Sequence, residues 1–261
     1  MSILGDGKSV VDLVTRSWTW VQDRRDPVRA QAQRLIDAFE AHGIARQQIA
    51  RVLPPELAFL PASLSTADKL KDKVTPALLD WAADYLALDR RWLDGVEARP
   101  HRRVDGYKNE RIYAEWLRQR VEVAPDVDRV LFVWTSEDPV TGSTSDGPVC
   151  LVYSEESAWL DGGSLSRYWL LSDQWPIDHG ACVVSMLKVV GIARSLGILV
   201  VGRLVPASVL HRLETGRIFA PQAQSRSGKP WYPEDMLPAI HGPQGASHGP
   251  GGFKLEARHP R

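Results

Sequence analysis

Residues 44–95 read IARQQIARVLPPELAFLPASLSTADKLKDKVTPALLDWAADYLALDRRWLDG, and this stretch decides the fold expected for the first part of the chain. Apolar residues recur in it at helical spacing, but capping and helix-breaking residues interrupt them repeatedly. Pro54 and Pro55 end one helix, because proline lacks the N–H that a helix interior needs. Thr75 and Pro76 open another, because proline suits the first helical position. The pattern predicts a bundle of short helices.

The capping residues also predict where each helix begins and ends. Asp26 is a suitable N-cap, and Pro27 a suitable first residue, for a helix that Gly43 terminates. Ser65 and Asp68 form a Ser-x-x-Asp capping pattern, which opens a later helix. The helices expected from these signals cover residues 27–42, 45–53, 65–73 and 75–88, and a final turn reaches Gly95.

Residues 75–95 resemble the closing helices of the phage-repressor, or Xre-type, helix-turn-helix family. That family typically shows a helix started by proline, a short turn, and a helix that ends in Leu-x-Gly, as Leu93-Asp94-Gly95 does here. The resemblance covers roughly residues 27–95, about a quarter of the chain. It implies an all-α helix-turn-helix bundle whose recognition helix lies in the major groove of DNA.

Counting back from Thr75 places the recognition helix at residues 65–73. The resemblance therefore implies a set of DNA-binding residues with separate roles. Ser65, Thr66, Lys69 and Lys73 would face the groove, with Lys71 nearer the backbone; Gln47 and Gln48 would meet phosphates; and Arg90, Arg91, Arg102 and Arg103 would add sequence-independent attraction.

An insert separates this chain from the family pattern and leaves other interpretations open. About twenty-five residues lie between Ala50 and Thr75, several more than the family's usual gap, and PPELAFLPASL occupies part of this distance. Asp68 and Asp72 also stand among the lysines of the expected recognition helix, which weakens a local positive field. One alternative is a structural bundle whose charges form a solvated face. Another is a bundle that binds a protein and not DNA.

The composition is that of an ordinary globular protein. The chain has 261 residues, of which 44% are hydrophobic and 25% charged, and no net charge. Two cysteines are too few for a disulfide framework or a zinc site by themselves. No apolar run approaches the roughly 18 residues that a membrane span needs, and no secretory signal is visible, so we expect a cytoplasmic protein without a membrane partner.

Charge and composition divide the chain into expected regions. Residues 1–121 carry 20 Lys and Arg against 17 Asp and Glu, whereas the remainder carries 12 against 15, an asymmetry compatible with an N-terminal DNA-binding part. A tail rich in Gly, Pro and Ser is expected to be disordered. The expected regions are a helical DNA-binding domain (1–95), a basic connector and helix (96–121), an α+β domain (122–236) and the tail (237–261).

The second half changes from helical to strand periodicity. Short runs rich in β-branched and aromatic residues predict strands at 129–134, 149–153, 168–172 and 198–204. A long apolar helix, expected to be capped by Asp178 and to end before Gly197, separates the last two. Because a strand–helix–strand unit usually gives a parallel crossover, the sheet should be mixed.

This order of elements is similar to that of the GNAT acetyltransferases, whose long helix begins at a phosphate-binding loop. The similarity implies an acetyl-CoA loop at residues 177–182, but Ile177 and Cys182 stand where that loop has a polar and a small residue, and Asp178 would repel phosphate. We therefore expect no transferase, no catalytic residue, no cofactor and no metal site. Cys182 is expected to be a buried structural residue, and Glu155 with Glu156 a strand-end charge pair.

Taken together, the sequence predicts a two-domain regulator that binds specific double-stranded DNA through its helical bundle. The α+β domain would sense a small-molecule or protein effector, or hold a homodimer together. The apolar residues that motivate a homodimer lie on the long helix: Val183, Val184, Leu187, Val190 and Ile192. The alternatives are a GNAT-like enzyme and a protein-interaction module without DNA binding.

Overall fold

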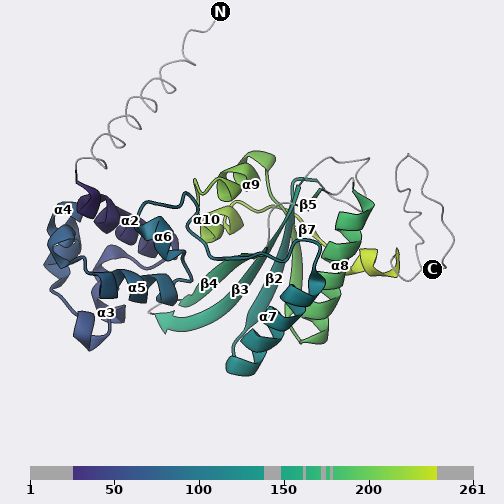
Figure 1. Cartoon of the computed structure of the whole chain (residues 1–261), viewed down its shortest axis with the longest axis horizontal. Coiled ribbons are helices and arrows are strands. Elements are labelled where there is room, and N and C mark those ends of the chain that lie inside the picture. The colour runs from purple at the N-terminus through teal and green to yellow at the C-terminus, as the bar shows by residue number, and fades with distance from the viewer. Residues whose placement is uncertain (1–25, 138–147, 161–162, 172–174, 177–178, 240–261) are drawn as a thin grey trace, which may run out of the picture. The chain divides into compact units, whose positions relative to one another are not determined.

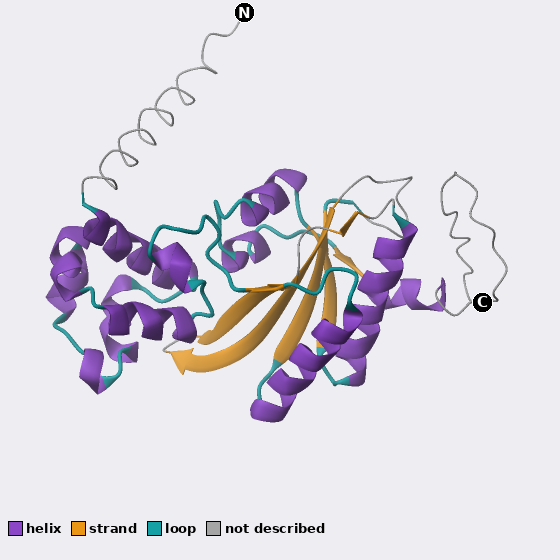
Figure 2. Ribbon diagram, viewed as in Figure 1, coloured by secondary structure: helices purple, strands orange, loops and turns teal. Residues whose placement is uncertain are grey.

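The computed structural model describes residues 26–137, 148–160, 163–171, 175–176 and 179–239, and the chain divides into two compact units, Met1–Glu97 and Ala98–Arg261. The first unit is helical, and the second contains a mixed sheet with helices (Figures 1 and 2). The expected α plus α+β architecture is confirmed at this level. Most of the expected disordered tail, from residue 240 on, lies outside the described residues. Within the described part, no helix is long and apolar enough to cross a membrane.

The helical unit consists of short helices and 3-10 turns, and its first helix has the N-cap and the terminating glycine that the sequence predicts. Its helices and 3-10 turns are α2 (Pro27–Ala41), α3 (Arg46–Val52), η1 (Pro55–Leu57), η2 (Pro61–Ser65), α4 (Ala67–Leu70), η3 (Lys71–Lys73), α5 (Pro76–Tyr85) and α6 (Arg90–Leu93). The Asp26 side chain accepts a hydrogen bond from the Arg29 N–H at 3.0 Å, which confirms Asp26 as the N-cap of α2. Gly43, at φ +82°, follows this helix as expected.

The core of the helical unit joins α2 to α5. Leu35, Ile36 and Phe39 of α2 are buried, as is Leu78 of α5. The ring of Phe39 lies 6.0 Å from that of Trp81, which is stacked in turn on Tyr85 at 4.9 Å. This aromatic row packs the two longest helices of the unit against each other, which fixes the surface on which the intervening turns lie.

The expected helix at residues 65–73 is present only in part: one α-helical turn, α4, and one 3-10 turn, η3, cover residues 67–73, and residue 65 belongs to the preceding turn. The 3-10 turn η2 ends at Ser65, the single helical turn α4 follows, and η3 comes after it. Thr66, and not Ser65, is the N-cap of α4: its Oγ1 accepts a hydrogen bond from the Lys69 N–H at 3.3 Å. The Ser65 hydroxyl instead donates to the carbonyl of Ala62. Four residues of α-helix replace the longer recognition helix that the resemblance implies.

The second unit is built on a seven-stranded sheet of order β1-β4-β3-β2-β6-β7, with β5 pairing β3. The long strands β2, β3 and β4 form an antiparallel meander, and β6 is parallel to β2. The mixed sheet is thereby confirmed. The strands are β1 (Arg103–Val104), β2 (Arg129–Thr135), β3 (Pro148–Leu160), β4 (Gly163–Leu171), β5 (Trp175–Pro176), β6 (Leu199–Leu204) and β7 (Pro230–Trp231).

Helices cover both faces of this sheet. One buried cluster joins α9 (Ala207–Glu214) and α10 (Ala220–Gln224) to residues such as Phe132, Trp134 and Tyr168. On the other face, α7 (Glu110–Val123) packs beside α8 (Gly180–Ser195), and α8 contacts β5 and β6 (Figure 1). The 3-10 segment η4 (Pro233–Ala239) also packs on α8.

One expectation about this unit is corrected, and the residues behind a second are now placed. Residues 98–121, expected as part of a connector, belong to the α+β unit, because β1 pairs with β4 and α7 covers the sheet. The apolar stripe of α8 is used in part inside the unit, since Leu187 and Val190 are buried. Of the five residues that motivated a homodimer, Val184 is exposed (38%), and Val183 and Ile192 are half-buried. Asp178, the expected helix cap, lies outside the described residues.

Candidate functional site

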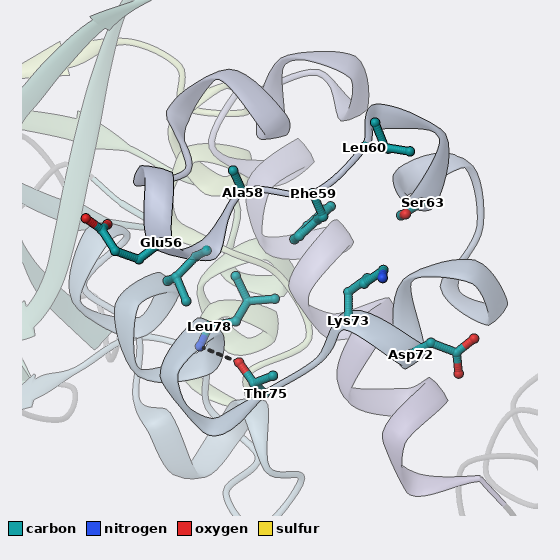
Figure 3. A pocket seen from close by; sticks show the side chains of 10 residues that line it. Glu56, Ala58, Phe59, Leu60, Ser63, Asp72, Lys73, Thr75 and Leu78 are labelled. Carbon is teal, nitrogen blue, oxygen red and sulfur yellow. Dashed lines mark hydrogen bonds between the residues drawn. The ribbon is translucent and has the colours of Figure 1, made fainter.

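A cleft of about 410 Å³ opens in the helical unit, where the insert meets the start of α5. Pro54 and Pro55 stop α3 and start the turn η1, and the chain then runs extended from Ala58 to Leu60 before Pro61 begins η2. This extended segment forms one wall. The lining residues are Glu56, Leu57, Ala58, Phe59, Leu60, Ser63, Asp72, Lys73, Thr75 and Leu78 (Figure 3).

The cleft has an apolar interior and a charged rim. Leu78 is buried and Phe59 half-buried, whereas the side chain of Leu60 is 75% exposed. Figure 3 shows the carboxylates of Glu56 and Asp72 at opposite ends of the lining side chains, with Phe59 and Leu78 between them. A hollow lined by apolar side chains, with a few polar groups at its edge, is the usual form of a binding site.

Thr75 fixes the wall of the cleft that belongs to α5. Its Oγ1 accepts a hydrogen bond from the Leu78 N–H at 3.2 Å, which is the expected N-cap of this helix (Figure 3). The same bond holds the first turn of α5, so Leu78 is presented at a fixed position. A local capping interaction therefore supports the cleft's interior.

Three of the expected DNA-binding residues use their side chains for local structure. Thr66 caps α4 and Ser65 bonds to the carbonyl of Ala62. Gln48 accepts a hydrogen bond through its Oε1 from the Ala45 N–H at 2.9 Å, closing the first turn of α3. These contacts give each residue a structural role that the sequence expectation did not include.

Two of the expected basic residues are ion-paired. Lys71 Nζ lies 2.7 Å from Asp26 Oδ2. Its hydrogen bond to that carboxylate raises the pKa of Lys71. Arg90 donates to Asp80 at 2.7 Å and also meets Asp94, and its hydrogen bond to Asp94 is the main cause of its raised pKa. Their charges are therefore offset within the protein and attract a phosphate less.

The other expected residues fall into two groups. Gln47, Lys69, Lys73 and Arg91 have exposed side chains in the helical unit. Arg102 and Arg103 are half-buried and belong to the α+β unit, where Arg103 opens β1. The expected set is therefore divided between the two units.

The described helical unit, residues 26–97, is not basic. It contains 9 Lys and Arg against 11 Asp and Glu, a net charge of 9 − 11 = −2. The positive surplus of the first half of the chain thus comes from residues outside this bundle. Binding to nucleic acid draws most of its affinity from contacts between basic residues and phosphates, so this charge balance disfavours DNA.

Residues 56–60 were missed as site residues, although the sequence contained a signal. The segment ELAFL lies between prolines, so it cannot continue a helix and bury its apolar side chains on a helical face. Such a segment leaves Phe59 and Leu60 partly or largely exposed. The resemblance directed the expectation to the lysines instead.

The remaining expectations concern Cys182 and metal binding. Cys182 is 1% exposed, as expected for a structural cysteine, and its Sγ lies 3.0 Å from the hydroxyl of Tyr107. The pKa of Tyr107 is raised, and this contact with Cys182 is the largest cause. Among the described residues, no group of three or more His, Cys, Asp or Glu side chains is placed to hold a metal ion.

Comparisons of the chain with known protein families, curated proteins and solved structures gave no match. The geometry and charge of the cleft are therefore the basis for a functional assignment.

Proposed function

We propose that the helical unit is a protein-interaction module. Its cleft receives a short segment of a partner protein that carries one or two large apolar side chains with Lys or Arg beside them. The observation that carries this proposal is the exposed Leu60 and half-buried Phe59 of a cleft whose rim holds Glu56 and Asp72.

The apolar interior would supply the binding free energy. Removing a Leu or Phe side chain from water stabilises a complex by about 1.5–3 kcal/mol, before the cost of ordering the segment. Leu60 has most of its surface still available for such burial. A partner side chain that contacts Leu60 and reaches toward Leu78 would cover the apolar surface that the bundle leaves open.

The rim would select the partner by charge. Glu56 and Asp72 outnumber Lys73, and the described bundle as a whole carries a net charge of −2 (9 basic against 11 acidic residues). A segment with basic residues is therefore attracted, whereas the phosphates of DNA are repelled.

A peptide selection tests this proposal. The full-length protein is used to select from a library of random linear peptides, and we expect enriched peptides that combine paired large apolar residues with a Lys or Arg. Leu60→Asp should weaken binding of these peptides by about tenfold or more, because it places a charge in an apolar contact. Val96→Asp is the matched control, since Val96 is 69% exposed in the same unit and does not line the cleft. Failure to enrich a motif, or equal binding by Leu60→Asp, would contradict the proposal.

Sequence-specific DNA binding is the second candidate, and in that case the chain is a transcription regulator whose α+β unit senses an effector or dimerises. The observation that favours it is the exposure of Gln47, Lys69, Lys73 and Arg91 on one small unit. Salt-sensitive retention on heparin and a selection from random DNA duplexes test it. The Lys69→Ala, Lys73→Ala double variant should then lose DNA binding while Leu60→Asp keeps it. If the double variant binds DNA as weakly as the parent protein does, and Leu60→Asp loses the selected peptides, the protein-interaction module is supported.

A further inference from the structure

Six side chains of the α+β unit form a charged and aromatic cluster between α7 and the sheet. Tyr153 and Glu155 lie two residues apart on β3, so their side chains share one face of the sheet. In the strand register they are paired with Trp169 and Arg167 of β4. Trp116 and Arg120, one turn apart on α7, cover them: the Trp116 ring lies 5.0 Å from Tyr153 and 5.8 Å from Trp169. The cluster therefore comes from three elements that strand register and helix period bring together.

Glu155 is the buried centre of this cluster. It is 2% exposed, and Tyr153 Oη donates to its Oε2 at 3.2 Å. Arg120 Nε donates to the same Oε2 at 3.1 Å, and a second nitrogen of Arg120 donates to Oε1. Arg167 also donates to Oε1. Two guanidinium groups therefore converge on one carboxylate.

A third arginine lies beside the cluster, and its guanidinium forms no ion pair with an acidic side chain of the described residues. Arg129 of β2 is directly opposite Glu155 in the strand register. Its guanidinium donates to the carbonyls of Val127 at 2.6 Å, Arg120 at 3.0 Å and Ala124, at the C-terminal end of α7. Backbone carbonyls accept hydrogen bonds from both terminal nitrogens of Arg129, its buried Nε has no hydrogen-bond partner among the described residues, and its unit charge stays in place.

The charges of this cluster do not balance. Arg120, Arg129 and Arg167 supply three positive charges against the one of Glu155, a net +2. The next carboxylate along β3, Glu156, points to the other face of the sheet because strand side chains alternate. The side chains of Arg120 and Arg167 each keep 27% of their surface exposed. A ligand from solvent can therefore reach both side chains, and Arg167 also has a buried Nε with no hydrogen-bond partner among the described residues.

We propose that Arg120 and Arg167 bind a phosphate dianion, as inorganic phosphate or as the terminal group of a small phosphomonoester. The planar fork of a guanidinium matches the oxygens of phosphate, and a dianion is the charge that neutralises the cluster. The ring of Trp169 lies against both guanidinium groups, 4.6 Å from that of Arg120 and 5.6 Å from that of Arg167. This stacking holds the two forks in place before the ligand arrives.

Titrations of the full-length protein test the site. Inorganic phosphate, methyl phosphate and dimethyl phosphate are added in turn, with sodium chloride at matched ionic strength, while tryptophan fluorescence is followed. Inorganic phosphate and methyl phosphate should give saturable changes, and the singly charged dimethyl ester should bind about tenfold or more weakly. Saturation by only one of the two dianions identifies which source of phosphate the site accepts.

Paired variants separate binding from structure. Arg167→Gln should weaken phosphate binding by about tenfold, whereas Glu155→Gln should strengthen it, because the competing carboxylate charge is removed. Arg118→Gln, an exposed change on the same helix, is the control and should bind as the parent protein does. Far-ultraviolet circular dichroism checks that each variant is folded. No saturable response, or Glu155→Gln binding that is unchanged or weaker in a folded variant, would overturn the proposal.

Discussion

Lys71 Nζ lies 2.7 Å from Asp26 Oδ2, so one ion pair ties the start of α2 to the 3-10 turn η3. Asp26 also caps α2 through its other oxygen, which accepts from the Arg29 N–H. A single carboxylate thereby joins two segments 45 residues apart. The next residues after Lys71 line the cleft, so this pair helps to hold the cleft's rim in place.

Asp26→Asn should destabilise the helical unit at neutral pH but not in strong acid. The hydrogen bond from Lys71, and then that from the Arg29 backbone, hold the pKa of Asp26 below its ordinary value of 3.8. The folded state thus favours the carboxylate, and this contribution is present above pH 3.8 and lost as the pH falls through the lower folded pKa. Asparagine keeps the capping ability, so the variant isolates the charge. Urea unfolding at pH 7 and at pH 2 measures the difference, and an equal deficit at both would contradict the ion-pair explanation.

His42 should make the helical unit less stable as the pH falls from about 6.5 to about 4. Burial lowers the pKa of His42 from 6.5 to about 4, although its hydrogen bond to the Ala38 carbonyl at 2.7 Å opposes this shift. The unfolded chain therefore takes up a proton that the folded chain refuses, which costs about 3 kcal/mol over that interval.

Urea unfolding followed through resolved NMR signals of α2 measures this slope. His42→Asn is the informative variant, because its amide can still donate to the Ala38 carbonyl but does not titrate. The variant should lose most of the pH dependence between these values. A parallel decline in both proteins would place the titrating group elsewhere.

Thr75→Ala should destabilise the helical unit by about 1 kcal/mol, the typical loss for removal of an N-cap. Thr75 Oγ1 accepts from the Leu78 N–H, so the variant also loosens the wall of the cleft. Thr75→Ser retains the hydroxyl and should restore most of the stability. Urea midpoints of the two variants provide the comparison, and an equal loss in Thr75→Ser would show that the methyl group and not the cap is responsible.

The predicted elements that proved correct depend on local interactions. Asp26 and Thr75 each bond to an N–H three residues ahead, so neighbouring residues contain the information for both caps. The departure from the expected helix at residues 65–73 involves a distant contact. Lys71 is held by Asp26, far away in the chain, and this contact accompanies the change from α-helical to 3-10 geometry that begins at Lys71.

Long-range pairing also explains what was missed in the α+β unit. The two-residue strand β1 exists because Arg103 and Val104 pair with the end of β4, and such a strand has no periodicity of its own. Glu155 and Glu156 were expected to form a charge pair at a strand end. The register instead buries Glu155 beside Arg167, 12 residues later, and a helix brings Arg120 over both. The alternation Tyr-x-Glu in one strand and Arg-x-Trp in the next was the available signal.

Two glycines of the α+β unit provide a last, matched prediction. Gly197 and Gly216 both adopt left-handed backbone, with φ of +74° and +71°, so alanine is strained at either position. They differ in their surroundings. A Cβ on Gly197 would meet no atom within 4 Å, whereas a Cβ on Gly216 would lie 2.1 Å from the carbonyl oxygen of Ala98.

Gly197→Ala should therefore cost about 1 kcal/mol, the price of the backbone strain alone. Gly216→Ala should cost more, because the chain at Ala98 must move before a side chain fits. Thermal unfolding of the two variants compares them directly, since both carry the same chemical change. Equal melting temperatures would mean that the segment at Ala98 moves away at little cost, and that its packing on Gly216 contributes little to the stability of the α+β unit.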